Sequence, residues 1–173
     1  MNELNEVWTQ MIDEASKKAR ASGRGDVADY LELKTTNDTI RAASVDWLLD
    51  AVLEIAAFAN RNNAGITIEN ETPHQFPFRN ANFVGSLIRF RQGVRCLTVE
   101  AGWTRTPNDG FMRGGALAGA KISHFGISKH NDELLLIKSN DLPDWVSIDK
   151  NEKKNPFDSR HLNQHFQIFL GGL

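Results

Sequence analysis

The chain has 173 residues, 40% of them apolar and 24% charged, and its formal net charge is −2. This length is enough for one well-packed core, so we predict a single globular domain over residues 1–173. The acidic balance argues against a protein that coats nucleic acid with its whole surface, and the lone Cys96 excludes an internal disulfide. Because the chain shows neither a signal-peptide pattern nor an apolar run of the roughly 20 residues that span a bilayer, we expect a cytoplasmic location and no membrane partner.

Two amphipathic helices are predicted in the first third of the chain. Residues 2–21 repeat apolar side chains at three- and four-residue spacing, and Ser22 and Gly23 are typical of a helix end. A second helix carries a broader apolar stripe, which consists of Val45, Leu48, Leu49, Val52, Leu53, Ala56 and Ala59. Asn37 and Ser44 are both suitable N-cap residues for its start, and the pattern does not choose between them.

From Gly65 onward the apolar period changes from about 3.6 residues to about two, which indicates strands. The predicted strands cover residues 66–69, 86–91, 94–103, 116–125, 133–138 and 145–148. Residues 74–78, which follow Pro73 and contain Pro77, are predicted as a loop because proline interrupts a sheet.

Polar loops and a C-terminal helix complete the predicted elements. Residues 104–115 and 149–155 are loops, and a final helix begins at a cap, Asp158 or Ser159, and ends before Gly171. Consecutive strands joined by short loops form antiparallel sheets, and helices at the two ends of a chain can cover one face of such a sheet. The sequence therefore predicts an α+β two-layer domain. Its mainly antiparallel sheet has five or six strands, with the N-terminal helices and the C-terminal helix packed on one face.

The segment most informative about function is residues 79–121, where seven basic and two acidic residues give a local net charge of +5. This asymmetry on an otherwise acidic chain creates a positive surface that attracts anions. The candidate ligand-binding residues are Arg89, Arg91, Arg95, Arg105 and Arg113. Guanidinium groups suit this role because they form paired hydrogen bonds with phosphate or carboxylate. We therefore predict a binding module for an anionic partner, nucleic acid included, and no cofactor.

A predicted hairpin decides how these arginines are presented. With residues 92–93 as its two-residue turn, Arg91 pairs with Val94, and alternation places Arg89, Arg91 and Glu100 on the uncovered face of the sheet. This face either serves solvation alone, with Arg89 and Glu100 as a weak cross-strand pair, or it binds the partner. The sequence leaves both interpretations open.

Two other functions stay open. A phosphate-ester hydrolase or nuclease would use Glu100, Asp109 and His124 as acid–base groups, which requires these residues to converge beside the arginines. A protein-interaction subunit of a homo-oligomer would use the sheet face or the loop aromatics Trp103 and Phe111. Aromatic and arginine side chains also dominate protein interfaces, so composition does not separate this function from anion binding.

No metal site is predicted. The nearest approach to one is the pair His161 and His165, which are one helical turn apart but lack the glutamate of the H-E-x-x-H zinc motif. Glu32-Leu33-Lys34 has the E-x-K form of a metal-dependent nuclease, an interpretation that requires residues 28–34 to be a strand.

Overall fold

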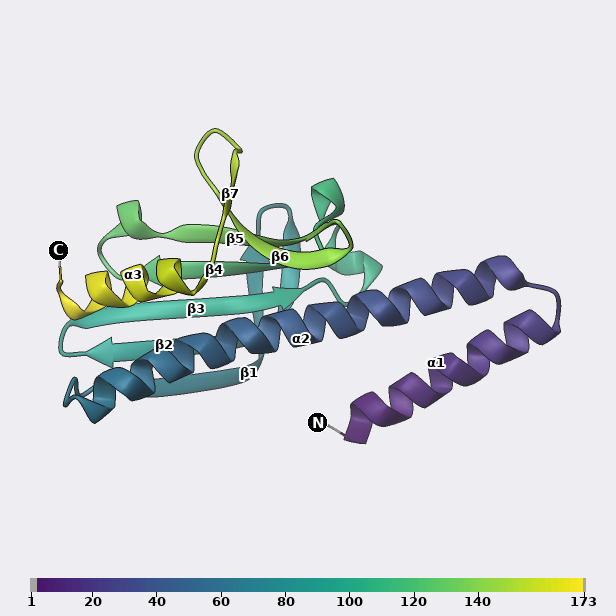
Figure 1. Ribbon diagram of the computed structural model, residues 1–173, viewed down its shortest axis with the longest axis horizontal. Helices are drawn as coiled ribbons and strands as arrows, with labels where there is room; N and C mark the ends of the chain where they lie inside the picture. Colours follow the sequence, from purple (N-terminus) through teal and green to yellow (C-terminus); the bar gives the residue numbers. More distant parts are fainter. Residues whose placement is uncertain (1–2, 173) are drawn as a thin grey trace. The chain divides into compact units, whose positions relative to one another are not determined.

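The computed structural model describes residues 3–172, without the side chains of residues 3–6, 8, 9 and 113. Within this range the helices are α1 (Glu3–Ala21), α2 (Gly25–Arg61) and α3 (Ser159–Leu170) (Figure 1). The strands are β1 (Thr67–Phe78), β2 (Ala81–Gln92), β3 (Arg95–Trp103), β4 (Ala118–His124), β5 (Asp132–Ser139), β6 (Leu142–Ile148) and β7 (Lys154–Pro156). The predicted α+β class is confirmed, and the sheet of seven strands has one strand more than the upper number expected. Contacts within the chain separate two compact units, residues 1–42 and 43–173.

In the first unit, α1 contacts the beginning of α2 across a short turn. Ser16 Oγ donates a buried hydrogen bond to the carbonyl of Ala28 (3.3 Å), and both residues are buried. Nearer the turn, Arg20 Nη2 lies 2.9 Å from a carboxylate oxygen of Glu32. The helix predicted over residues 2–21 is confirmed for its described part.

α2 is longer than predicted, because it begins at Gly25 and not at either of the two expected caps. Thr35, Thr36 and Thr39 each donate a hydroxyl hydrogen bond to the carbonyl four residues earlier (2.9 Å). Their polar groups are thus satisfied inside the helix and do not end it.

Residues 28–34 are helical, which removes the basis of the E-x-K nuclease interpretation. Among residues 3–172, no helix combines the length and the apolar composition that crossing a bilayer requires.

The strands form one antiparallel sheet in which each strand pairs with its neighbours in sequence, from β1 at one edge to β7 at the other. β1 extends well beyond the strand predicted over residues 66–69, and the prediction of a loop at residues 74–78 is wrong. Pro73 and Pro77 are compatible with β1 because an edge strand can turn the side without N–H groups toward solvent.

Two helical segments of the second unit cover one face of the sheet, which we call the inner face (Figure 1). α3 reaches this face through Phe166, whose ring centroid lies 5.1 Å from that of Phe90, and α2 through Ser44, whose carbonyl accepts a hydrogen bond from Trp145 Nε1 (3.2 Å). The predicted C-terminal helix is confirmed, with Asp158 as its cap. The buried side chains of the inner face include Ile88, Phe90, Leu97, Val99, Ala120, Ile122, Leu134 and Leu136.

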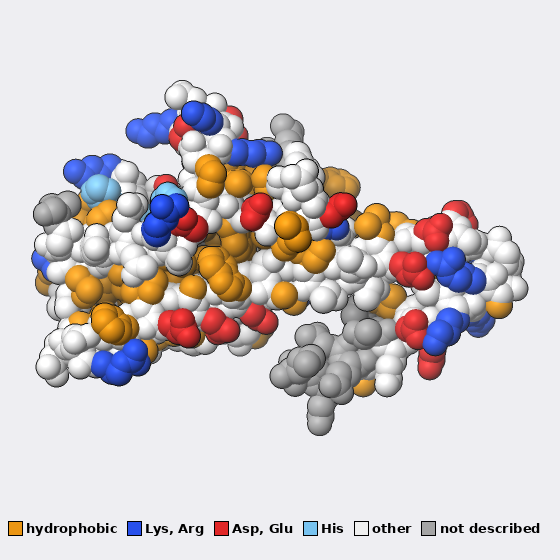
Figure 2. All heavy atoms as spheres, in the orientation of Figure 1, with side chains coloured by type: hydrophobic (Ala, Val, Ile, Leu, Met, Phe, Trp, Pro, Cys, Tyr) orange, Lys and Arg blue, Asp and Glu red, His pale blue; other side chains and the backbone are white. Residues whose placement is uncertain are grey.

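Acidic side chains gather along α2 on the helical side of the molecule (Figure 2). In the second unit, Asp46, Asp50 and Glu54 are exposed and follow one another at four-residue spacing. The opposite face of the sheet, which we call the outer face, carries three basic residues of the central segment, Arg89, Arg91 and Lys121. Its side chains include Arg89, Arg91, Cys96, Thr98, Glu100, Lys121 and Ser123. Part of the local positive charge predicted from the sequence, that of Arg89, Arg91 and Lys121, thus lies on the face that the helices leave uncovered.

A pair of glycines bends the β1–β2 hairpin. Gly85 of β2 pairs with Gly102 of β3, and a Cβ atom on Gly85 would lie 1.9 Å from the carbonyl oxygen of Ala101. On the other side of β2, the register with β1 shifts between Glu71 and His74. The close approach therefore requires glycine, and it lets β2 leave the plane of the sheet at this point.

Beyond this bend, the end of the β1–β2 hairpin folds across the outer face, behind the sheet in Figure 1. The rings of Phe78 and Phe83 stack with their centroids 4.6 Å apart, and a Cβ atom on Gly119 of β4 would come within 2.6 Å of Phe83. The buried members of this second apolar cluster are Phe76, Phe78, Ala81, Phe83, Ala116, Leu135 and Val146. The sheet thus has a large core on its inner face and a smaller core at one end of its outer face.

We expect Gly102→Ala to lower the free energy of unfolding by at least about 2 kcal/mol, because its methyl group would lie 2.5 Å from the carbonyl oxygen of Val84. Urea denaturation followed by far-UV circular dichroism measures this change. Gly172→Ala is the matched control, since the atom nearest to its Cβ is 3.4 Å away, and it should stay within about 0.5 kcal/mol of the wild type. Equal stability of the two variants would show that the close approach does not constrain the fold.

Candidate anion-binding site

The arginines are presented by the β2–β3 hairpin, whose turn differs from the predicted one. Arg91 pairs with Cys96 and not with Val94, so the turn residues are Gly93 and Val94. Gly93 has a φ of 58°, which suits the first position of a hairpin turn that favours glycine. The predicted register is wrong by two residues, and a shift by two keeps every side chain on its face. The predicted placement of Arg89 and Arg91 on the uncovered face is therefore confirmed.

One carboxylate holds both outward arginines of β2. Glu69 of β1 accepts a hydrogen bond from Arg89 Nη1 at its Oε2 (2.9 Å), and its Oε1 lies 3.2 Å from Arg91 Nε. The hydrogen bond from Arg89 and the charges of the two guanidinium groups hold the pKa of Glu69 below its ordinary value. Arg89 thus takes Glu69 as its partner and not Glu100, and two cations share one anion.

A hollow of about 680 Å³ lies beside these arginines at the turn end of the hairpin. We call it the arginine hollow, and its lining includes Arg89, Arg91, Arg95, Thr98, Ser123 and Phe125. The guanidinium of Arg95 lies against Gly171 at the C-terminal end of α3, where the helix dipole favours a cation. Thr98 and Ser123 face each other on β3 and β4, and they add two hydroxyl groups to the guanidinium groups of Arg89 and Arg91. Phe125 is 78% exposed and offers a flat apolar surface at the rim.

The remaining two candidate arginines are not part of this group. Arg105 Cζ lies 3.7 Å from the ring centroid of Trp103, and Arg105 Nη2 donates to the carbonyl of Val84 (3.2 Å). These contacts are at the far end of β3, about 23 Å along the strand from the position of Arg91. The side chain of Arg113 lies outside the described residues. One compact ligand can therefore contact the arginines of the hollow but not Arg105 as well.

Glu100 is engaged by a histidine that the sequence analysis did not single out. His74 Nε2 lies 2.8 Å from Glu100 Oε1, and its Nδ1 lies 3.1 Å from Glu71 Oε1. Burial lowers the pKa of His74, but its hydrogen bonds to Glu100 and Glu71 outweigh this effect, so that the pKa is raised above its ordinary value. When protonated, His74 thus bridges two carboxylates of the outer face.

Asp109 has a structural role in the loop after β3. Its Oδ2 accepts hydrogen bonds from the backbone N–H groups of Thr106 (2.8 Å) and Arg105 (2.9 Å). These two bonds lower the pKa of the Asp109 carboxyl. The carboxylate thus caps the short helical turn Pro107–Asp109.

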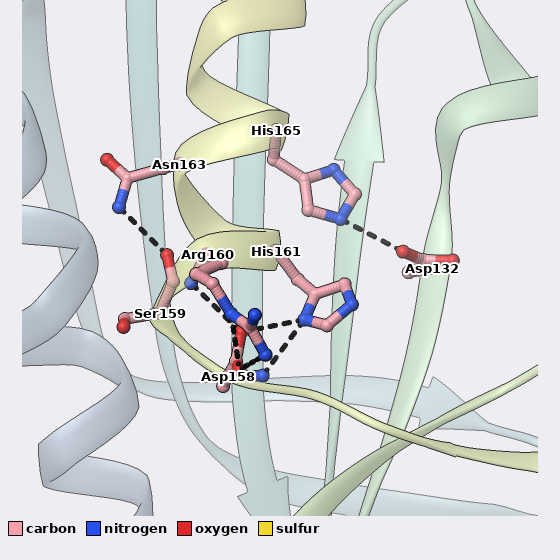
Figure 3. A network of polar contacts seen from close by, with 7 residues as sticks. All are labelled: Asp132, Asp158, Ser159, Arg160, His161, Asn163 and His165. Carbon is pink, nitrogen blue, oxygen red and sulfur yellow. Dashed lines mark hydrogen bonds and ion pairs between the residues drawn. The ribbon is translucent and has the colours of Figure 1, made fainter.

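His124 belongs to a buried chain of side chains on the inner face. Its Nε2 lies 2.9 Å from His165 Nδ1, and His165 Nε2 lies 3.0 Å from Asp132 Oδ2, a contact visible in Figure 3. Because a carboxylate only accepts, we assign the proton of His165 to Nε2, so that its Nδ1 accepts from His124 Nε2. Burial, followed by the charges of His165 and His130, lowers the pKa of His124 to about 4. His124 is therefore a neutral hydrogen-bond donor.

Glu100, Asp109 and His124 do not form one catalytic centre. Glu100 projects from the outer face, His124 lies on the inner face beside α3, and Asp109 is in a loop. A hydrolase or nuclease that uses these three groups would need them to meet at one substrate atom. The arrangement therefore gives no support to the hydrolase or nuclease alternative.

His161 and His165 lie on successive turns of α3 but take different partners (Figure 3). His161 Nδ1 lies 2.9 Å from Asp158 Oδ1 in the helix cap, and its ring stacks on Phe157 with the centroids 5.3 Å apart. His165 instead contacts Asp132 (3.0 Å). In the described part of the chain, no group of three or more His, Cys, Asp or Glu side chains is placed to hold a metal ion.

Two residues of the site were missed in the sequence analysis, Glu69 and Phe125. Glu69 alternates with Thr67 and Glu71 in β1, and pairing this segment with β2 by the same alternation identifies it as the partner of Arg89. Phe125 directly follows β4, and no local pattern connects it with the hairpin turn.

Comparisons with protein-family models, with curated proteins and with solved structures find no match to this chain.

The pKa of His124 produces a specific pH dependence of stability. Since the folded value is about 4 and the ordinary value is 6.5, the unfolded chain binds more protons between these two pH values. The contribution of His124 is therefore complete above about pH 6.5 and decreases by up to about 3 kcal/mol as the pH falls toward about 4.

We expect His124→Asn to remove this part of the pH dependence. Urea denaturation of both proteins at about pH 7.5 and about pH 5 measures it, and the wild type should lose about 2 kcal/mol more than the variant between these values. His74, whose raised pKa acts in the opposite direction, is present in both proteins and cancels in the difference. The same pH dependence in the two proteins would contradict the assignment.

Proposed function

We propose that this protein is a binding module for an anionic partner, and that the partner binds in the arginine hollow. The observation that carries the proposal is the convergence of Arg89 and Arg91 on the single carboxylate of Glu69, at the edge of a hollow that Arg95 also lines. Two guanidinium groups against one carboxylate give the site an excess of one positive charge.

The donors of the hollow suit a phosphate or a carboxylate. A guanidinium group binds such anions through two parallel hydrogen bonds, which are stronger than bonds between neutral groups. Each guanidinium carries five N–H donors, so Arg89 and Arg91 together have more donors than the carboxylate of Glu69 can accept. The hydroxyl groups of Thr98 and Ser123 supply further hydrogen bonds to an anion that enters.

Neighbouring charges limit the positive surface to the turn end of the hairpin. One step away along the outer face, Glu71 and Glu100 flank His74, and Lys121 Nζ donates to the carbonyl of Pro77. The hollow therefore favours a partner that inserts one or a few anionic groups over one that follows a long charged track. A short single-stranded segment of nucleic acid meets this requirement, because the exposed ring of Phe125 can stack on a base.

A second candidate function is that of an interaction subunit in a homo-oligomer. Phe111 is 84% exposed, which suits an interface residue in the isolated chain. Trp103, the other aromatic expected in this role, is covered by the guanidinium of Arg105. Of the two aromatic side chains expected at an interface, that of Phe111 is thus exposed and that of Trp103 is covered. This function therefore has less support than anion binding.

Fluorescence anisotropy with a labelled single-stranded oligonucleotide at several NaCl concentrations tests the proposal. If Arg89 and Arg91 contact phosphates, the logarithm of the binding constant should fall with the logarithm of the salt concentration with a slope of about −1.4. Contacts from all five candidate arginines would give about −3.5. Absence of binding at low salt, both to the oligonucleotide and to inorganic pyrophosphate in a thermal-shift assay, would contradict the proposal.

Substitutions at the hollow should change affinity in opposite directions. Arg89→Ala and Arg91→Ala should each weaken binding at least about tenfold, since each removes charge-assisted hydrogen bonds. Glu69→Gln should strengthen binding about two- to fivefold, because the competing internal carboxylate is lost. Arg105→Ala is the matched control at the other end of the hairpin and should leave affinity unchanged. Equal affinity of all four variants would place the binding site elsewhere.

A further inference from the structure

The end of the β1–β2 hairpin encloses a second cavity, separate from the arginine hollow. It has a volume of about 380 Å³ and is lined by the apolar side chains of Phe78, Phe83, Met112, Leu135 and Ile148, which we call the phenylalanine cavity. This volume is within the range of small-molecule sites, about 300–1,000 Å³.

Separate segments of the chain build the walls of this cavity. The stacked rings of Phe78 and Phe83 come from the folded hairpin end, and Phe83 also meets Phe76 edge-on at 5.7 Å between centroids. Leu135 enters from β5 as a buried member of the same cluster, and the half-buried Met112 comes from the loop before β4. Apolar surfaces from distant parts of the chain thus surround a space left between the described side chains.

Charged side chains stand at the rim of the cavity. Arg79 Nη1 lies 2.9 Å from Glu152 Oε2, and its Nε lies 3.4 Å from Glu133 Oε2. Lys154 also lines the cavity and makes no ion pair with the described residues, so it adds a positive charge to a rim where Arg79 already meets two carboxylates. Arg79 is the first residue of the two-residue turn between β1 and β2, and its φ of 53° suits this position of a hairpin.

We propose that the phenylalanine cavity binds a small amphiphile with one apolar chain and an anionic head group. The chain would lie among the phenylalanine, leucine, isoleucine and methionine side chains, and each methylene group that enters should tighten binding about fourfold. The head group would remain at the rim, where Arg79 forms paired hydrogen bonds with a carboxylate. A straight-chain carboxylate is the simplest molecule that satisfies both conditions.

Isothermal titration calorimetry with sodium octanoate, sodium decanoate and decyltrimethylammonium tests this proposal on the full chain. Decanoate should bind about fifteenfold more tightly than octanoate, because it buries two further methylene groups. Decyltrimethylammonium has an alkyl chain of similar length with the opposite charge and should bind at least about tenfold more weakly than decanoate. Equal binding of decanoate and decyltrimethylammonium, or no binding of either, would overturn the proposal.

Variants and a direct measurement locate the ligand. Ile148→Phe places a larger side chain in the cavity wall and should abolish decanoate binding, whereas Arg79→Gln should weaken it about tenfold but keep the dependence on chain length. Lys138→Gln, which removes an exposed charge of β5 outside the lining, and Arg89→Ala in the arginine hollow are the controls that should bind normally. Nuclear Overhauser contacts between decanoate and the ring of Phe83 test the site in the wild type, so the result does not depend on the folding of a variant. Their absence in the bound complex would overturn the assignment.

Discussion

The phenylalanine cavity and the outer apolar cluster depend on one close contact, the approach of Gly85 to the backbone of β3 opposite Gly102. Because neither residue has a Cβ atom, β2 lies against β3 at a distance that no other residue allows, and it leaves the plane of the sheet there. Toward the β2–β3 turn, the hairpin lies within the sheet and presents the arginines of the hollow. On the other side of the bend it folds across the outer face and closes the phenylalanine cavity. A straight β2 would have neither this cavity nor the outer apolar cluster.

Charges on the outer face are shared in two opposite ways. At the hollow, Glu69 serves two arginines, whereas at the hairpin end Arg79 takes two carboxylates, those of Glu133 and Glu152. The first arrangement leaves an excess of positive charge, so anion recognition there is mainly electrostatic. The second is close to neutral, so recognition there depends on apolar burial, and the charge at the rim only orients the ligand. Exposed ion pairs contribute little to stability, and a ligand can therefore rearrange either set at small cost to the fold.

Local periodicity predicted the elements in which one continuous face is buried, because burial of one face imposes the period. The same argument placed Arg89 and Arg91 on the uncovered face. This placement is correct although the β2–β3 turn was predicted at the wrong residues, because the register error was an even number of residues. Pairing between distant segments has no local signal. Glu69 lies in a segment predicted as a strand, but its contact with Arg89 depends on the register between β1 and β2, which that segment alone does not contain. The contact of His124 with His165 likewise joins β4 to α3, whose packing no local pattern contains.

His74 lies between the two halves of the outer face and connects them. It follows the register shift in β1, its ring stacks on Phe76 with the centroids 5.8 Å apart, and its two nitrogens meet Glu71 and Glu100. Both carboxylates lie opposite Leu87, on the strands at either side of β2, and without a cation between them they would repel each other. The raised pKa of His74 means that the protonated ring holds β1 and β3 together fully below its ordinary value of 6.5, and that this contribution is lost as the pH rises through the raised value. His74, which lies in a stretch predicted as a loop because of its prolines, thus holds β1 in place between the arginine hollow and the phenylalanine cavity.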